Sequence, residues 1–319
     1  MAPSKRLTVF ITGCSPGGMG AALASAFHAA GHHVFATARD PSKLSDLASQ
    51  GIEILTLDVT SASSIESAVE AVERSISTKS SSDNDSVPAG LDILINNAGG
   101  HYTAPISDAS LASAKALFDL NVWAQLAVTQ ALLPLLMRSR SSAPSAAKDD
   151  LAVPMIVNHT SVGSVAALPF QGVYSASKAA FARLSDAMRL EFAALGIRVV
   201  ELKTAMVMTN FIKNSQNNNV EGKSQQLPRG SLFEPARAVV EDVMSQDQFD
   251  GRGITAEQWA AGVVSDLMQR NPPAIIWRGQ DAIWGRFMSL MPTWMVDGLL
   301  RKMMKLDVVE QIMKESSKD

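Results

Sequence analysis

Short, near-continuous apolar runs recur along the chain and alternate with longer stretches in which apolar residues return at helical spacing. A run that is apolar at every position indicates a strand buried on both faces, whereas helical spacing indicates a helix with one buried face. The predicted strands are 7–12, 33–38, 52–57, 91–96, 154–159, 197–202 and 274–277. The main predicted helices are 18–30, 42–49, 62–78, 110–138 and 172–195. This alternation predicts an α/β fold, a doubly wound parallel sheet of the Rossmann type with right-handed crossovers.

Two polar stretches interrupt this pattern. Residues 78–90 and 138–150 are rich in Ser, Asp and Pro, and we expect them to be exposed loops because strands of the same sheet continue beyond both. We therefore predict one large domain over residues 1–278. Residues 279–319 are expected to form a helical C-terminal extension packed on the same domain.

Within the extension, apolar residues recur at helical spacing on either side of Pro292, which predicts two short amphipathic helices over 282–304. This apolar stripe consists of Trp284, Phe287, Met288, Met291, Trp294, Met295, Leu299 and Met303. Three interpretations stay open. The stripe covers the sheet or a subunit contact, it forms an adaptable methionine-rich lid over a substrate cleft, or it lies on a membrane surface.

Composition restricts the functional classes. With 319 residues, 46% of them hydrophobic, the chain can bury a large core, and its net charge of −3 provides no electrostatic attraction for nucleic acid. Cys14 is the only cysteine, so no intrachain disulfide can form and a reducing, cytoplasmic location is expected. The five histidines lack metal-site spacing, and we expect no metal. We find no signal peptide and no uninterrupted apolar stretch long enough to span a membrane.

The stretch TGCSPGGMG, Thr12 to Gly20, is a glycine-rich turn directly after the first predicted strand. Such turns bind phosphate at the start of a helix. Gly13 and Gly18 have the spacing of a nucleoside-triphosphate loop, but Met19-Gly20 stands where that loop requires Lys followed by Ser or Thr. The pattern GxGxxG also fails, because Ala21-Ala22-Leu23 follows Gly20. A dinucleotide-binding turn of another spacing remains.

Tyr174 begins the stretch YSASK, and Lys178 lies four residues later on the same face of a predicted helix. A phenol with a pKa of about 10 is a poor proton-transfer group at neutral pH. We expect the neighbouring ammonium to lower the pKa of Tyr174 by roughly 1–3 pH units, which suits proton transfer. Ser161 lies just past a strand end, where ligand sites of open α/β sheets gather. Asn121 lies within a predicted helix, although an amide is a mediocre helix former.

Two further motifs complete the set: NNAGG (96–100) follows the fourth predicted strand, and Asp58 ends the third. Over residues 7–212 these motifs resemble the short-chain dehydrogenase/reductase family in order and spacing. The stretch ELKTAMVMTN (201–210) resembles the branch that contains acyl-dihydroxyacetone-phosphate reductases. One departure is Lys203-Thr204-Ala205-Met206, which stands where the family usually has Pro-Gly.

The resemblance implies four catalytic residues. Tyr174 is expected to protonate a substrate carbonyl while the cofactor delivers hydride, and Ser161 to hydrogen-bond the same oxygen. Lys178 is expected to hold the nicotinamide ribose and to lower the pKa of Tyr174. Asn121 is expected to support a water that relays protons to Lys178.

The resemblance also implies that residues 1–278 are a dinucleotide-binding catalytic domain. Asp58 would meet the adenine, Asn97 to Gly99 the adenine ribose side, and Val207 and Thr209 the nicotinamide carboxamide. The full implied cofactor set is Gly13, Ser15, Gly18, Gly20, Arg39, Asp58, Asn97, Ala98, Gly99, Tyr174, Lys178, Val207 and Thr209.

The residues after the second predicted strand indicate NADP(H) rather than NAD(H). An NAD enzyme would place Asp or Glu there, but Thr37-Ala38 occupies the region and Arg39 follows, available to the 2′-phosphate. We expect NADPH-dependent reduction of a ketone or aldehyde on a bulky apolar substrate, or the reverse oxidation. The expected enzyme is a cytoplasmic homo-oligomer, with peripheral contact to the endoplasmic reticulum or a lipid droplet as a variant. Two alternatives stay open: a non-redox cyclisation or dehydration on the same fold, and a cofactor-sensing binding protein without turnover.

Overall fold

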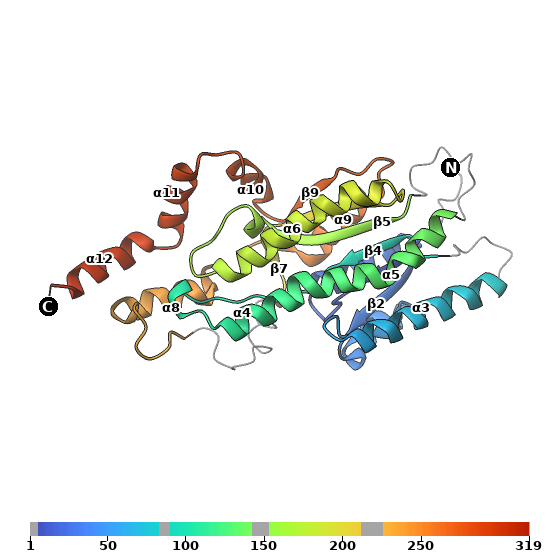
Figure 1. The fold of residues 1–319 in the computed structure, drawn as a ribbon, viewed down its shortest axis with the longest axis horizontal. Coiled ribbons are helices and arrows are strands. Elements are labelled where there is room, and N and C mark those ends of the chain that lie inside the picture. The colour runs from blue at the N-terminus through green and yellow to red at the C-terminus, as the bar shows by residue number, and fades with distance from the viewer. Residues whose placement is uncertain (1–5, 83–89, 142–152, 212–225, 250, 319) are drawn as a thin grey trace.

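A seven-stranded parallel sheet forms the centre of the protein, with the strand order β3-β2-β1-β4-β5-β6-β9 (Figure 1). The structure is a computed structural model that describes residues 6–82, 90–141, 153–211, 226–249 and 251–318. The strands are β1 (Thr8–Ile11), β2 (His33–Ala38), β3 (Glu53–Thr56), β4 (Ile93–Asn96), β5 (Met155–Ser161), β6 (Arg198–Thr204) and β9 (Ile275–Arg278). Each overlaps a predicted apolar run, so the prediction of a doubly wound parallel sheet is confirmed.

The order in which successive strands are added to the sheet reverses at β1. It proceeds outward from β1 through β2 to β3, and it then returns to the other side of β1 and continues from β4 to β9. Val9 of β1 is therefore paired with Val34 of β2 on one side and with Ile93 of β4 on the other. Ligands of open α/β sheets bind beyond the carboxyl ends of the strands at such a switch point. The glycine-rich turn after β1 lies there.

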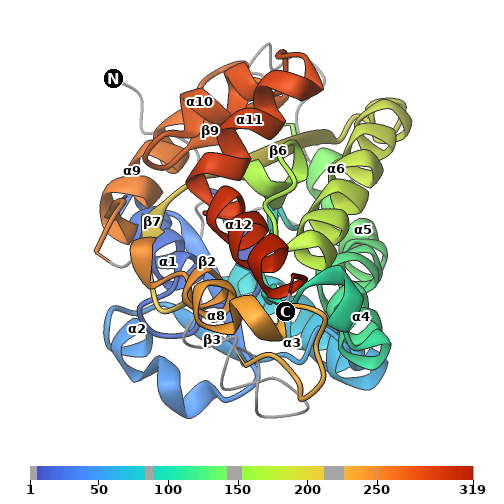
Figure 2. The same cartoon turned by 90° about the vertical axis from the view of Figure 1, so that its left-hand side faces the viewer.

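Helices cover both faces of the sheet, each over its own apolar core. The helices on one face are α1 (Met19–Ala29), α2 (Ser45–Ser49) and α9 (Ala256–Leu267). The helices on the opposite face are α3 (Ala62–Ser82), α5 (Ala124–Ser141) and α6 (Gly172–Ala193). Figure 2 shows the two layers, with α1, α2 and α9 to the left and α5 and α6 to the right. Trp259 of α9 is fully buried, which makes it the largest side chain of the first core.

The two predicted loops begin later than the sequence indicated. α3 continues to Ser82 and α5 to Ser141, so residues 78–82 and 138–141 are helical. Serine is only a slightly weaker helix former than the residues before it, and a helix already nucleated extends through such positions at small cost. The rest of the first loop up to residue 89, and residues 142–150 of the second, lie outside the described residues.

The C-terminal extension is helical and consists of α10 (Ala282–Met288), α11 (Thr293–Met303) and α12 (Leu306–Ser316). The two predicted helices on either side of Pro292 are thus confirmed as α10 and α11. The apolar stripe, however, does not cover the sheet with its largest side chains, because Trp284 is 59% and Trp294 is 74% exposed. α12 instead packs on α8 (Arg237–Ser245) in a third apolar cluster. Figure 1 shows α11 and α12 extending beyond one end of the sheet.

One helical run in the described part of the chain is long and apolar enough to cross a membrane by length and composition. It covers Leu111–Ser139 and joins α4 (Leu111–Phe118), a π-helical turn (Asp119–Trp123) and α5. Half of its most apolar window is buried inside the protein, as in the core helix of a globular domain, so the run is weak evidence for a membrane span.

Candidate active site

The predicted catalytic side chains gather beyond the carboxyl end of β5. Ser161 is the last residue of β5, and its Oγ accepts a hydrogen bond of 3.0 Å from the Gly163 N–H in the 3-10 turn that follows. Tyr174 and Lys178 lie on the first turns of α6, and both are buried. A Cβ on Gly163 would lie 3.4 Å from the Ser161 Oγ and 3.5 Å from the Tyr174 ring. The two hydroxyl-bearing side chains therefore flank one glycine.

Burial dominates the electrostatics of Tyr174 and Lys178. Desolvation raises the pKa of Tyr174 above its ordinary value, and the hydrogen-bonding contact with Ser161 only partly opposes this rise. Desolvation likewise lowers the pKa of Lys178 to about 8. The expectation that Lys178 depresses the pKa of Tyr174 is wrong for this structure, because the ammonium donates a hydrogen bond of 3.1 Å to the His159 carbonyl oxygen instead. A phenol with a raised pKa keeps its proton at neutral pH, as a proton donor must.

Asn121 lies in the π-helical turn between α4 and α5. Such turns occur often at functional sites. Its side chain accepts a bond of 2.8 Å from the Gly100 N–H and donates bonds of 3.0 Å to the Gly100 carbonyl and to the Ser177 Oγ. A Cβ on Gly99 would lie 3.2 Å from the Asn121 Oδ1 and 3.5 Å from the Lys178 Nζ. The structure therefore brings Asn121, Lys178 and the Gly99 backbone together, and the water relay through Asn121 stays a prediction.

The glycine-rich turn is built for close backbone approach. Gly13 has φ +72°, and a Cβ there would lie 2.8 Å from the Ala98 Cα. A Cβ on Gly20 would lie 2.5 Å from both the Asn97 Nδ2 and the Gly13 carbonyl oxygen. Because a real Cβ does not approach other atoms this closely, only glycine fits either position.

The N-terminus of α1 has the features of an anion site. Gly18 is its N-cap and has no side-chain cap, and its N–H donates to the Ser15 carbonyl at 3.0 Å. Gly17 has φ +68°, a conformation that glycine adopts readily. A groove of about 1000 Å³ opens here, lined in part by Gly17, Gly18, Val207 and Thr209. The positive end of a helix dipole and uncapped N–H groups favour negative charge, so these residues fit the pyrophosphate of a dinucleotide.

Val207 and Thr209 reach this groove from beyond the sheet. Val207 lies in β7 (Val207–Met208), which pairs with β8 (Ile254–Thr255) in a separate two-stranded sheet. The next residue after Thr209, Asn210, donates its N–H to the Gly17 carbonyl at 3.2 Å. The segment expected near the nicotinamide is thus tied to the turn expected at the pyrophosphate.

Asn97 and Ala98 are held against that turn by Thr12, which the sequence analysis did not single out. The Thr12 Oγ1 accepts bonds of 2.9 Å from the N–H groups of both residues. The Asn97 Nδ2 donates to the carbonyls of Thr12 and Gly13, at 2.7 and 3.0 Å, and its Oδ1 lies 3.0 Å from the His159 Nδ1. Because its amide is fully occupied within the protein, Asn97 shapes the site through its backbone. The only sequence signal for this role of Thr12 is its place at the start of the glycine-rich turn, which lies against the NNAGG motif.

Arg39 and Asp58 form a separate rim at the ends of β2 and β3. Burial raises the pKa of Asp58, but bonds of 3.0 and 2.7 Å from the N–H and hydroxyl of Thr60 and the charge of Arg39 outweigh it, so the pKa lies below its ordinary value. Asp58 is therefore a carboxylate within electrostatic reach of an exposed guanidinium. The expected role of Arg39 at the 2′ position of a cofactor stays a prediction.

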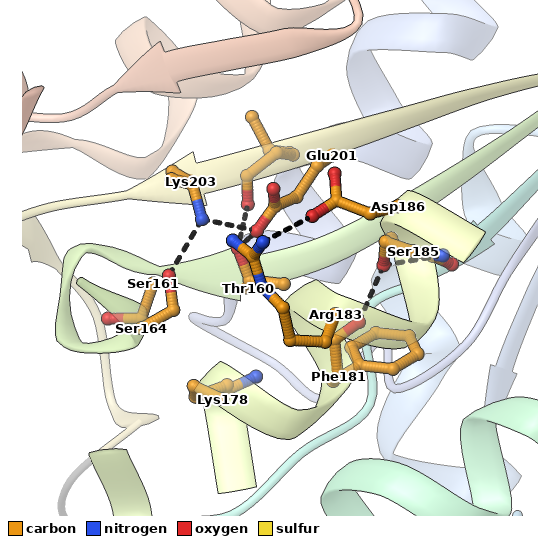
Figure 3. Close-up of polar contacts among 12 residues, drawn as sticks. Thr160, Ser161, Ser164, Lys178, Phe181, Arg183, Ser185, Asp186, Glu201 and Lys203 are labelled. Carbon is orange, nitrogen blue, oxygen red and sulfur yellow. Dashed lines mark hydrogen bonds and ion pairs between the residues drawn. The ribbon is translucent and has the colours of Figure 1, made fainter. Parts of the chain in front are cut away.

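Lys203, in the stretch that departs from the family pattern, forms a buried ion pair near Ser161 (Figure 3). The Lys203 Nζ lies 2.5 Å from the Glu201 carboxylate and donates to the Ser164 Oγ at 2.8 Å, and both charged side chains are 4% exposed. Thr160 donates to the same carboxylate at 2.8 Å. Lys203 therefore fixes the turn that follows Ser161.

Two further residues complete the description. Cys14 is fully buried, and burial raises the pKa of its thiol to about 12, which agrees with a small filler rather than a reactive thiol.

His101, which no sequence motif indicated, packs on the Tyr174 ring with a centroid distance of 4.6 Å. Among the described residues no group of three or more His, Cys, Asp or Glu is placed to hold a metal ion.

Known proteins share this arrangement. A family model described as short chain dehydrogenase matches residues 7–220. The chain is 44% identical over 308 residues to a short-chain dehydrogenase/reductase of Pestalotiopsis microspora, with 97% of both chains covered. It is 29% identical over 309 residues to the NADPH-dependent 1-acyldihydroxyacetone phosphate reductase of Schizosaccharomyces pombe, with 93% of this chain and 94% of the other covered. A solved short-chain dehydrogenase from Streptomyces avermitilis superposes with a TM-score of 0.69 at 25% identity, covering 97% and 98% of the two chains. The chain therefore belongs to the short-chain dehydrogenase/reductase family of oxidoreductases.

Proposed function

We propose that this protein is an NADPH-dependent carbonyl reductase, or in reverse an alcohol dehydrogenase, that acts on bulky apolar substrates. The observation that carries the proposal is that Ser161 and Tyr174 flank Gly163 beyond β5, while Lys178, four residues after Tyr174 on α6, lies beside the Gly99 backbone. A binding protein without turnover has no need for a buried ammonium and a buried phenol on one helix face, since burying both is costly.

The residues divide the reaction between them. The bound nicotinamide supplies or accepts the hydride. Tyr174 donates its proton to the carbonyl oxygen, and its raised pKa keeps that proton in place until charge develops on the oxygen. Ser161 hydrogen-bonds the same oxygen and orients it. Lys178, whose pKa of about 8 lies close to neutral pH, holds the cofactor ribose and exchanges protons readily.

NADP(H) is the proposed cofactor because of Arg39. The guanidinium is exposed at the end of β2, and its charge acts on the Asp58 carboxylate. A 2′-phosphate offers a stronger partner for a guanidinium than a ribose hydroxyl does. The relative from Schizosaccharomyces pombe, whose name states NADPH dependence, supports the same choice.

The surroundings of Tyr174 support an apolar substrate. Its ring is flanked by His101 and by Phe211, at centroid distances of 4.6 and 6.5 Å. The exposed tryptophans of α10 and α11 add apolar surface that suits a second subunit or a lipid surface, and the single buried thiol suits the cytoplasm. A ketone attached to a long or polycyclic apolar group fits these features better than a small sugar.

NADPH oxidation with a panel of small and large ketones tests the proposal. Wild-type protein is expected to oxidise NADPH only when a ketone is present, and Tyr174→Phe is expected to lose turnover while NADPH affinity stays nearly unchanged. Tyr102→Phe, which removes the only other phenol, is the matched control and should retain turnover. Conversion of a substrate without NADPH oxidation would support the cyclase or dehydratase alternative. NADPH binding without turnover of any ketone would support the sensing protein.

A further inference from the structure

His101 packs against Tyr174, the proposed proton donor. It follows the NNAGG motif, it is 8% exposed, and its ring lies against the Tyr174 ring with an interplanar angle of 54°. Phe211 lies 6.1 Å from the His101 ring, so the two aromatic rings close one side of the phenol together. Burial lowers the pKa of His101 to about 4, the Gln171 hydrogen bond opposes this fall, and the nearby charge of Lys178 adds to it. The ring is therefore neutral at neutral pH.

Two buried glutamines hold the imidazole from different parts of the fold. The His101 Nε2 lies 3.1 Å from the Gln171 Oε1 and 3.2 Å from the Gln246 Nε2. One neutral nitrogen cannot donate to the first and accept from the second at once, so the ring bonds Gln171 when Nε2 carries the proton and Gln246 when Nδ1 carries it. Gln171 is the residue directly before α6, the helix that carries Tyr174. Gln246 directly follows α8 and has φ +60°, a conformation that a non-glycine residue adopts at a cost. The side chains of Gln171 and Gln246 are as buried as the ring that they contact.

α8 is in turn attached to the C-terminal helix. Met304 and Val309 are buried against Val240 and Val243 of α8, and Phe170, directly before Gln171, joins the same apolar cluster. The Lys305 Nζ also reaches the Asp242 carboxylate at 2.7 Å. Figure 2 shows α12 and α8 together at the end of the molecule that faces the viewer, between α1 on one side and α6 on the other. An unbroken set of contacts thus leads from α12 through α8 and Gln246 to the ring beside Tyr174.

We propose that His101 is a positioning residue for Tyr174, and that its bond to Gln246, which lines the groove together with Val207 and Thr209, seats the α8–α12 unit so that large substrates are favoured. The second part of this inference, the preference for large substrates, rests on the proposed function. Its first part concerns only the phenol and does not depend on which reaction the enzyme performs.

The two proposed roles require different chemical features of the His101 side chain. To shield and orient the phenol the residue needs a flat ring, which phenylalanine also provides. To hold Gln246 it needs a polar atom at the position of Nε2, which glutamine provides and phenylalanine does not. Alanine removes both functions. Three substitutions therefore separate the two parts.

The first test measures the ionisation of Tyr174 directly. The chain has two tyrosines, so ¹³C-labelled tyrosine in a Tyr102→Phe background gives one phenol signal, which NMR follows through a pH titration without substrate. With His101→Ala, water reaches the phenol and the pKa of Tyr174 should fall toward its ordinary value, since burial is what raises it. His101→Phe should keep the wild-type value. Identical pKa values in all three proteins would overturn the positioning role, whether or not any ketone is reduced.

The second test uses steady-state kinetics on a large and a small ketone. His101→Phe and Gln246→Leu should each raise KM for the large ketone by roughly two- to tenfold, the effect of losing one hydrogen bond, and leave KM for the small ketone unchanged. The Kd for NADPH is measured in parallel, because Gln246 also lines the groove beside Gly17 and Val207. His101→Gln should restore part of the loss. Gln269→Leu, the same change on an exposed residue after α9, is the control and should have no effect. Equal effects on both ketones, or no rescue by His101→Gln, would overturn the role of the Gln246 contact.

Discussion

The Lys178 ammonium is bonded to the carbonyl oxygen of His159, at 3.1 Å, and thereby joins the catalytic helix to the central strand β5. The His159 ring extends this connection, since its Nδ1 lies 3.0 Å from the Asn97 Oδ1 and its Nε2 lies 2.7 Å from the Thr204 Oγ1. The ring also stacks on Trp259, and burial followed by the charge of Lys178 lowers its pKa to about 3. A neutral histidine under the site therefore holds the elements that carry the catalytic and cofactor-binding residues.

The buried ammonium of Lys178 predicts a specific dependence of stability on pH. Its pKa is 10.5 in the unfolded chain and about 8 in the folded protein, so between these values the unfolded state binds more protons and the free energy of unfolding rises with pH. Below pH 8 the wild type bears the full cost of the buried charge. Lys178→Met removes that cost and should gain, relative to wild type, on the order of 3 kcal/mol more at pH 7 than at pH 10.5. Urea unfolding of both proteins across this range measures the difference. A difference that does not change with pH contradicts a buried ammonium.

Arg39→Ala should weaken NADPH binding selectively. A charge-assisted hydrogen bond contributes about 1.5–3 kcal/mol, so the Kd for NADPH should rise about ten- to a hundredfold while the Kd for NADH changes little. Fluorescence titration with both cofactors measures this. Arg74→Ala, which removes an exposed arginine of α3 paired with Glu70, serves as the control. Equal losses for NADPH and NADH would refute the assignment of Arg39 to the 2′-phosphate.

Gly20→Ala should impair both stability and cofactor binding. The added Cβ meets the Gly13 carbonyl and the Asn97 amide, which cannot move without opening the turn, and such overpacking costs about 1–3 kcal/mol. Gly298→Ala is a matched change on α11, where a Cβ has no neighbour within 4 Å, and it should stabilise the protein by up to about 1 kcal/mol. Thermal unfolding with and without NADPH compares them. The interpretation of the turn fails if Gly20→Ala binds NADPH as the wild type does.

The exposed tryptophans of α10 and α11 should contribute to binding another subunit or a membrane, and not to the stability of the fold. Replacing Trp284 and Trp294 by Gln should change the free energy of unfolding by no more than about 0.5 kcal/mol, because both side chains are already in contact with solvent. The same double variant should reduce the oligomer mass seen by light scattering if this face is a subunit contact, or co-sedimentation with phospholipid vesicles if it is a membrane contact. Unchanged behaviour in both assays contradicts its role as a binding surface.

The parallel sheet and the pairing of Tyr174 with Lys178 on one helix face could be predicted from the sequence alone, because both depend on short-range regularities. A buried parallel strand must be apolar throughout, so each of the seven strands was recognisable from a few consecutive residues. Tyr174 and Lys178 share a helix face whatever surrounds them. Helix ends were less certain: α3 and α5 each continue a few residues into a serine-rich stretch, where local preference is weak.

The pKa values, long-range contacts and solvent exposure of these residues depend on how distant segments pack, which the sequence pattern does not specify. Desolvation sums over side chains from many segments, so the direction of the Tyr174 pKa shift was opposite to the expectation from its neighbour Lys178 alone. The contacts of His101 with Gln171 and Gln246 join residues 70 and 145 positions apart, and those of Thr12 with Asn97 join residues 85 apart. The solvent exposure of Trp284 and Trp294 was equally unpredictable, since an amphipathic pattern requires a covering surface without specifying which one. Periodicity specifies which face of an element is apolar, and the packing of distant elements specifies what that face meets.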